Sequence, residues 1–138
     1  SHTFENIYYY GRLAYDQTLS LENECDIMLA IYDPKIENHK FAAPNKFYES
    51  LMLGKPIIMV RGTGMSEVVE ENSIGELIEY SKEGFIDGVN RLIERKGEWH
   101  LIGNRMKEIY RNQYCWDEME RRLINLYAEL QKEKDIDC

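Results

Sequence analysis

The chain has 138 residues and a net charge of −8, with 43 % hydrophobic and 12 % aromatic residues. This length fits one domain with its own core, and this composition excludes an intrinsically disordered protein.

The acidic balance argues against nonspecific nucleic-acid binding, because that binding depends on lysine and arginine neutralising phosphates. No apolar run is long enough to span a membrane. Three cysteines without metal-ligand spacing favour a reducing cytoplasm: Cys25, Cys115 and Cys138.

The first part of the chain predicts alternating strands and helices. Residues 7–10 form a short β-prone run, and residues 13–24 have the pattern of a helix. The apolar run 27–32 shows no alternation, which predicts a strand of a parallel sheet buried on both faces. Residues 35–43 are polar, and we expect a loop there.

The most informative segment is residues 44–56, which predicts a short helix followed at once by a strand. Pro44 suits the first turn of a helix, where its missing N–H group costs nothing. Gly54 suits a left-handed helix end, and Pro56 cannot continue the helix. The apolar residues 57–60 then predict a buried strand.

The second half predicts a short helix at residues 66–70, an edge strand at 75–78, and three longer helices at 82–95, 98–112 and 116–132. Apolar residues recur at helical spacing in these three helices, and we expect them to face the core. They are Phe85, Ile86, Val89, Leu92, Ile93, Trp99, Ile102, Met106, Ile109, Tyr110, Trp116, Met119, Leu123, Leu126, Tyr127 and Leu130. The order of elements predicts one α/β domain over residues 1–132 with a parallel sheet, and a disordered tail at 133–138.

A parallel sheet binds ligands beyond the carboxyl ends of its strands. We expect three loops to meet there: residues 11–13, 33–43 and 61–65. Five basic and two acidic residues make 35–61 locally positive, which is either an ordinary surface or an attraction for a small anion.

The helix that begins near Pro44 can hold a phosphate with its free N–H groups and its positive dipole end. Lys46 adds a charge there, and Glu49 shares a flank with Lys46 and Asn45. The carboxylate of Glu49 can accept two hydrogen bonds from a diol such as that of a ribose. The alternative is an exposed ion pair with Lys46, which contributes only a few tenths of a kcal/mol. The histidines and cysteines show no spacing for a metal site.

Several of these runs, taken in order, resemble the C-terminal half of a GT-B glycosyltransferase. The most similar group is the retaining, family-4-like group of bacterial surface-polysaccharide and lipopolysaccharide synthesis, and the resemblance extends from Ile7 to Leu130. The runs are Gly11-Arg12-Leu13, Cys25-Asp26-Ile27-Met28-Leu29, Pro44-Asn45-Lys46-Phe47-Tyr48-Glu49, Gly54-Lys55-Pro56-Ile57-Ile58, Gly62-Thr63-Gly64 and Tyr114-Cys115-Trp116.

The resemblance implies a Rossmann-like, nucleotide-sugar-binding domain and assigns roles to six residues. Glu49 matches the residue that binds the donor ribose. Pro44, Asn45 and Lys46 open the helix that faces the donor diphosphate, and Arg12 and Leu13 match a loop that touches the base. The chain departs from the family at Phe41, where the family has a further glutamate.

The resemblance also implies that no metal or cofactor is needed and that the nucleotide sugar is the substrate. It implies an N-terminal acceptor-binding domain and further strands that this chain lacks, so we expect a fragment that is inactive alone and assign it no catalytic residue. The acceptor can be membrane-associated, which would place the full enzyme in the cytoplasm or against the inner face of the membrane.

Two further expectations do not depend on catalysis. A truncated sheet leaves a strand edge open, which predicts self-association through that edge. The alternative function is a non-catalytic, flavodoxin-like interaction or regulatory module, although residues 9–12 lack the acidic residues usual after its first strand.

Overall fold

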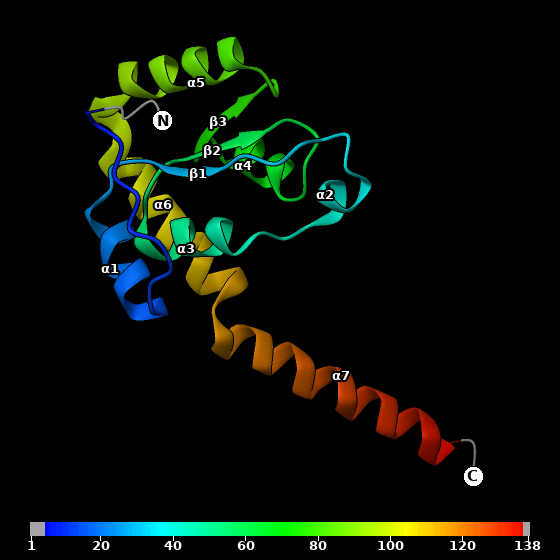
Figure 1. Ribbon diagram of the computed structural model, residues 1–138. Coiled ribbons are helices and arrows are strands. Elements are labelled where there is room, and N and C mark those ends of the chain that lie inside the picture. Colours follow the sequence, from blue (N-terminus) through cyan, green and yellow to red (C-terminus); the bar gives the residue numbers. More distant parts are fainter. Residues whose placement is uncertain (1–4, 137–138) are drawn as a thin grey trace.

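The computed structural model of the protein describes residues 5–136 and contains a three-stranded parallel sheet flanked by helices (Figure 1). The strands are β1 (Met28–Ala30), β2 (Ile57–Val60) and β3 (Gly75–Ile78), and they lie in the order β1-β2-β3. In register, Met28 lies beside Ile57, and Ile57 lies beside Gly75. The predicted α/β class and parallel sheet are confirmed, and the fold is compatible with a Rossmann-like arrangement.

The described residues form seven α-helices. They are α1 (Tyr15–Glu24), α2 (Glu37–Phe41), α3 (Asn45–Leu53), α4 (Ser66–Asn72), α5 (Lys82–Glu94), α6 (Trp99–Ile109) and α7 (Trp116–Ile136). A 3₁₀ turn, η1 (Lys96–Glu98), precedes α6, and a wider π-type turn, η2 (Tyr110–Tyr114), follows it. None of these helices is both long enough and apolar enough to cross a membrane.

One face of the sheet carries the larger core, which α3, α4 and α6 cover. Side chains that are fully buried there come from all three helices: Phe47, Leu51, Val69 and Met106. Close packing of α3 against α6 depends on two glycines, because a Cβ atom on Gly103 would lie 2.7 Å from the carbonyl oxygen of Gly54. Gly54 ends α3 in the left-handed conformation with φ of 71°, as the sequence predicted.

The opposite face is covered by α5, which packs on β2 and β3. Its buried residue Leu92 packs with Ile58, Val60 and Ile78. The indole N–H of Trp99 donates a hydrogen bond to the carbonyl oxygen of Leu92 at 2.9 Å, which ties the start of α6 to α5. Two residues of α5 that we expected inside are exposed, Ile86 and Ile93.

The strand expected at 27–32 is shorter than predicted, and its burial on both faces is wrong. Only Met28–Ala30 pairs with β2, and Leu29 is 44 % exposed. The reason is that Leu29 lies on the face that α5 covers, while α5 packs mainly against β3. Residues 7–10 do not form a strand either: they are exposed, and they lie alongside no strand of the sheet (Figure 1). The polar stretch 35–43 contains α2, which we did not expect.

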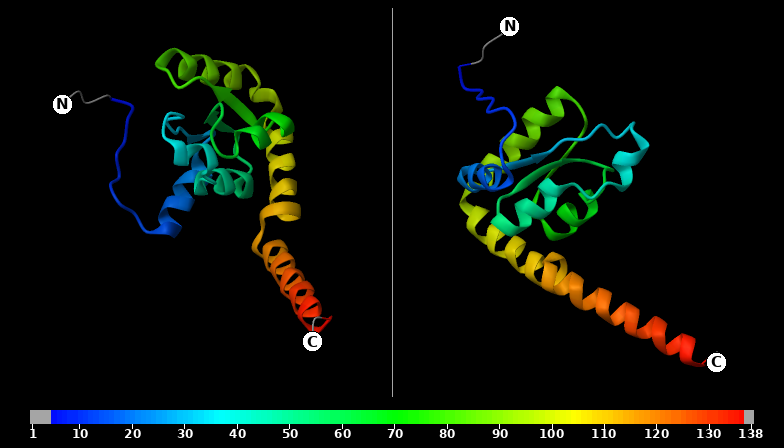
Figure 2. Two further views of the ribbon diagram at one scale, coloured as in Figure 1. Left: turned by 90° about the vertical axis from the view of Figure 1, so that its right-hand side faces the viewer. Right: turned by 60° about the horizontal axis from the view of Figure 1, so that its bottom comes forward.

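Helix α7 extends away from the rest of the molecule in all views (Figure 2). The prediction that its apolar side chains face the core is wrong for five of the six residues, because they are exposed: Trp116, Leu123, Leu126, Tyr127 and Leu130. The sixth, Met119, is half-buried. The helix continues to Ile136, so the backbone of residues 133–136 is helical where we expected a disordered tail. Residues 137–138 lie outside the described part of the chain.

Candidate functional site

The loop that leads into α3 is held by the turn after β2. The N–H group of Gly64 donates a hydrogen bond to the carbonyl oxygen of His39 at 3.1 Å. A Cβ atom on Gly64 would lie 1.8 Å from the carbonyl oxygen of Ala42, so only glycine fits this position. Two of the three predicted loops, 33–43 and 61–65, therefore meet beside the start of α3.

The start of α3 leaves backbone donors available. Pro44 is buried and caps the helix, and the N–H of Phe47 bonds to the carbonyl oxygen of Pro44 at 2.9 Å. The N–H groups of Asn45 and Lys46 have no carbonyl within the helix to bond, because they belong to its first turn. The positive end of the helix dipole lies at the same place.

Glu49 lies one turn further along α3 and is only 7 % exposed. Its Oε2 accepts a hydrogen bond from the Nζ of Lys46 at 3.2 Å. The ion pair that we considered from the spacing is therefore present, but its carboxylate is buried and does not lie on a solvated face.

A third charged residue, which no sequence pattern indicated, completes this group. Glu22 of α1 is 8 % exposed and also accepts a hydrogen bond from Lys46. Its other oxygen, Oε2, is buried and has no hydrogen-bond partner. Glu22 precedes Lys46 by 24 residues, and no local motif signals such a contact; its place in a helix next to Asn23 and Glu24 reads as ordinary polar surface. We call Glu22, Lys46 and Glu49 the carboxylate cluster.

The two glutamates of the carboxylate cluster raise the pKa of Lys46 and of the neighbouring Tyr15. Burial alone would lower the pKa of Lys46, but the hydrogen bonds to Glu22 and Glu49 outweigh this effect and raise the pKa. Burial, together with the negative charges of Glu49 and Glu22, raises the pKa of Tyr15. One lysine thus partly balances two carboxylates, and Tyr15, which is 64 % exposed, lies against them. Such a group can accept hydrogen bonds from hydroxyl groups of a ligand.

The structure does not bring Arg12 and Leu13 to the start of α3. Arg12 is exposed and Leu13 is half-buried, in the segment that leads into α1. Among the described residues no hydrogen bond or ion pair joins Arg12 to α3. Figure 1 shows this segment on the α1 side of the molecule, away from α2 and the loop after β2.

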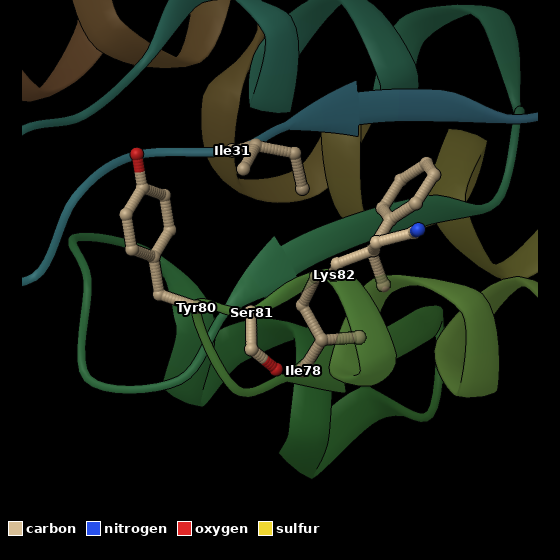
Figure 3. A pocket seen from close by; sticks show the side chains of 6 residues that line it. Ile31, Ile78, Tyr80, Ser81 and Lys82 are labelled. Carbon is tan, nitrogen blue, oxygen red and sulfur yellow. The ribbon is translucent and has the colours of Figure 1, made fainter.

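A hollow of about 240 Å³ lies at the carboxyl ends of β1 and β3, beside the start of α5. Figure 3 shows its lining from Ile31 on one side to Tyr80 and Ser81 on the other. Its walls are mainly apolar, and the exposed Lys82 is one of the residues that line it. This hollow lies on the α5 face of the sheet, whereas the carboxylate cluster lies on the α3 side, so the two are separate candidate sites.

The arginines near the β3 edge already have carboxylate partners. Arg91 and Arg95 both bind Glu76, at 3.0 and 3.1 Å, and Arg61 binds Glu70 at 2.8 Å. This surface therefore offers an anion little free charge. Within residues 5–136 no cluster of three or more His, Cys, Asp or Glu side chains is arranged to hold a metal ion.

Comparisons of this chain with protein-family models, with curated proteins and with solved structures found no match. The class that the structure itself defines is an α/β protein with a small parallel sheet, and its candidate sites are the carboxylate cluster with the start of α3 and the hollow beside α5.

Proposed function

We propose that this chain is the donor-binding part of a glycosyltransferase that transfers a sugar from a nucleotide sugar, in bacterial surface-polysaccharide or lipopolysaccharide synthesis. The observation that carries the proposal is Glu49, a buried carboxylate one turn from the free N–H groups of α3. The motifs around it resemble those of the donor side of such enzymes.

In this proposal the start of α3 binds the diphosphate. The N–H groups of Asn45 and Lys46 and the helix dipole stabilise its negative charge without a metal ion. Pro44 fixes the entry of the chain into the helix, and the close contact between Gly64 and Ala42 keeps the neighbouring loop in place.

Glu49 would bind the ribose through its two hydroxyl groups. Tyr15 is close enough to Glu49 for the carboxylate to raise its pKa, and it is itself mostly exposed, so in this proposal a ligand that reaches Glu49 displaces Tyr15. Transfer of the sugar also needs an acceptor held against the donor, so the partner in this proposal is an acceptor-binding domain.

The proposal is tested by titrating UDP, GDP and their 2′,3′-dideoxy analogues against the chain, with calorimetry or NMR. Wild type should prefer the ribonucleotides, because only they offer the diol. Glu49→Gln should weaken ribonucleotide binding by about 10- to 100-fold, which corresponds to losing hydrogen bonds to a charged group. It should leave binding of the dideoxy analogues almost unchanged.

Glu67→Gln is the matched control, because Glu67 is an exposed glutamate in the first turn of α4. It should bind like wild type. Tyr15→Ala should bind ribonucleotides at least as well as wild type, since it removes the ring that lies near Glu49. Equal affinity of wild type for ribo- and dideoxynucleotides would show that Glu49 does not bind a diol.

The second candidate, a non-catalytic interaction module, is favoured by one observation. Large apolar side chains are exposed on α7 and on β1, as in Leu126 and Leu29, and surfaces of this kind mark interaction sites. A chain that binds none of these nucleotides at millimolar concentration would support this candidate over the first.

A further inference from the structure

The exposed side of α7 has the spacing of a coiled-coil helix. Its apolar residues follow one another at intervals of three, four, three and four positions: Trp116, Met119, Leu123, Leu126 and Leu130. This is the a and d pattern of the heptad repeat, in which every such residue packs against a partner helix. We call these five residues the α7 stripe.

The α7 stripe has no partner along most of its length. Trp116 is 69 % exposed and Leu126 is 52 % exposed, and Leu123 and Leu130 are similar. Among the described residues, the main contacts of α7 with another element are those with η2, at the start of the helix. A helix that projects from a domain gains little stability from its own hydrogen bonds, so an apolar stripe of this kind calls for a second helix.

We propose that the α7 stripe pairs with the α7 stripe of a second copy of this chain, with the two helices antiparallel. In this alignment Leu123 packs against Leu126 of the second copy, and Met119 packs against its Leu130. Each contact occurs twice because the pair has twofold symmetry, and so four layers form around a centre between Ile124 and Asn125. This inference does not depend on the proposed function.

The charges beside the stripe complement one another in the antiparallel alignment. Arg122 and Glu129 flank the stripe at the g positions of successive heptads. Antiparallel pairing places Arg122 of each copy opposite Glu129 of the other, which gives two attractive pairs. Parallel pairing places Arg122 opposite Tyr127 instead, so Arg122 loses this partner. In the single chain Arg121 and Arg122 both bind Glu118, each at 2.7 Å. Arg122 must leave Glu118 to make the new contact.

The shape of the molecule and the charge of the helix agree with this alignment. The rest of the domain is attached at the Trp116 end of α7 (Figure 2), so antiparallel pairing places the two domains at opposite ends of the helix pair. Between Trp116 and Lys132 the chain has four acidic and three basic residues. The net charge of −8 therefore resides mainly elsewhere and does not prevent the helices from meeting.

The first test measures the mass of the chain by light scattering over a range of concentrations up to about 1 mM. A dimer is expected, and Leu126→Glu should make it monomeric without changing the fold of the domain, which circular dichroism checks. A chain that stays monomeric throughout overturns the proposal. So does a dimer that withstands Leu126→Glu, because it must use another surface, such as the open edge of β1.

The second test uses charge reversal to establish the alignment. Arg122→Glu should weaken the dimer by about 3- to 10-fold, since it turns two attractions into two repulsions, and Arg122→Glu with Glu129→Arg should restore it. Arg121→Glu is the matched control: Arg121 also binds Glu118 but lies on the side of α7 away from the stripe. Equal effects of the two arginine variants would overturn the antiparallel pairing.

The third test uses disulfides in a chain whose native cysteines are replaced by serine. A mixture of the Leu123→Cys and Leu126→Cys variants should form a disulfide between the two variants on mild oxidation. Neither variant alone should form one, because equivalent residues do not face each other in the antiparallel pair. Efficient cross-linking of Leu123→Cys with itself would show a parallel pair and contradict the proposal.

Discussion

Helices α6 and α7 carry similar apolar stripes, but they meet different surroundings. In α6, Ile102, Met106 and Ile109 are buried against α3 and the sheet. In α7, Leu123, Leu126 and Leu130 follow the same kind of spacing and remain exposed. The difference shows that an apolar stripe defines which side of a helix needs a partner, while the partner is set by the arrangement of the other elements.

The turn between the two helices is the point where the surroundings change. Helix α6 ends at Ile109, and the π-type turn η2 redirects the chain before α7 begins. Tyr114 packs edge-on against Phe47 and Tyr48 of α3, with ring centroids 5.8 and 5.4 Å apart. This aromatic contact ends the packed part of the chain, and α7 leaves the domain beyond it (Figure 1).

The largest expected effect is the contrast between truncating a stripe residue in α6 and in α7. Met106→Ala should lower the free energy of unfolding by about 2–5 kcal/mol, because it opens a cavity in the core. Leu126→Ala, measured where the chain is monomeric, should change it by less than about 0.5 kcal/mol. Urea unfolding of both variants provides the comparison, and similar losses would mean that α7 packs on the domain in solution.

A smaller effect is expected where α6 crosses α3. Gly103→Ala adds a Cβ atom 2.7 Å from the carbonyl oxygen of Gly54, so backbone must move. The expected loss is about 1–3 kcal/mol, although alanine favours a helix more than glycine does. Gly97→Ala is the control, because a Cβ atom there meets nothing within 4 Å. If Gly103→Ala were as stable as wild type, the two helices would lie further apart than described.

The sequence predicted elements well where local signals set their ends. Gly54 ends α3 as predicted, whereas Pro44 lies one residue before the first turn in which we expected it, because α3 begins at Asn45. The buried strand β2 followed from four consecutive apolar residues. These signals need no knowledge of distant parts of the chain.

The sequence failed where burial depends on distant elements. The exposure of Leu29 results from the position of α5, and no pattern within residues 27–32 reports that position. Residues 7–10 have high β propensity but lie beside no strand, and a strand needs hydrogen bonds from a neighbour. Glu22 likewise joins Lys46 only through the packing of α1 on α3. Of the candidate site, the α3 residues could be foreseen, but their neighbour on α1 could not.

The smallest expected effect concerns ion pairs on α7, whose charges are near solvent. Hydrogen bonds from Arg121 and Arg122 lower the pKa of Glu118 to about 2. A lowered pKa means that these pairs stabilise the folded helix at a pH above the ordinary glutamate pKa of about 4.3, and that this stabilisation is lost as the pH falls through about 2.

NMR titration of the Glu118 carboxyl group measures this pKa directly. With Arg121→Gln it should move toward the ordinary value, and far-UV circular dichroism should show a slight loss of helix at pH 5, because exposed pairs contribute little. An ordinary pKa in the wild-type chain, at a concentration where it is monomeric, would show that the two arginines do not hold Glu118 in solution.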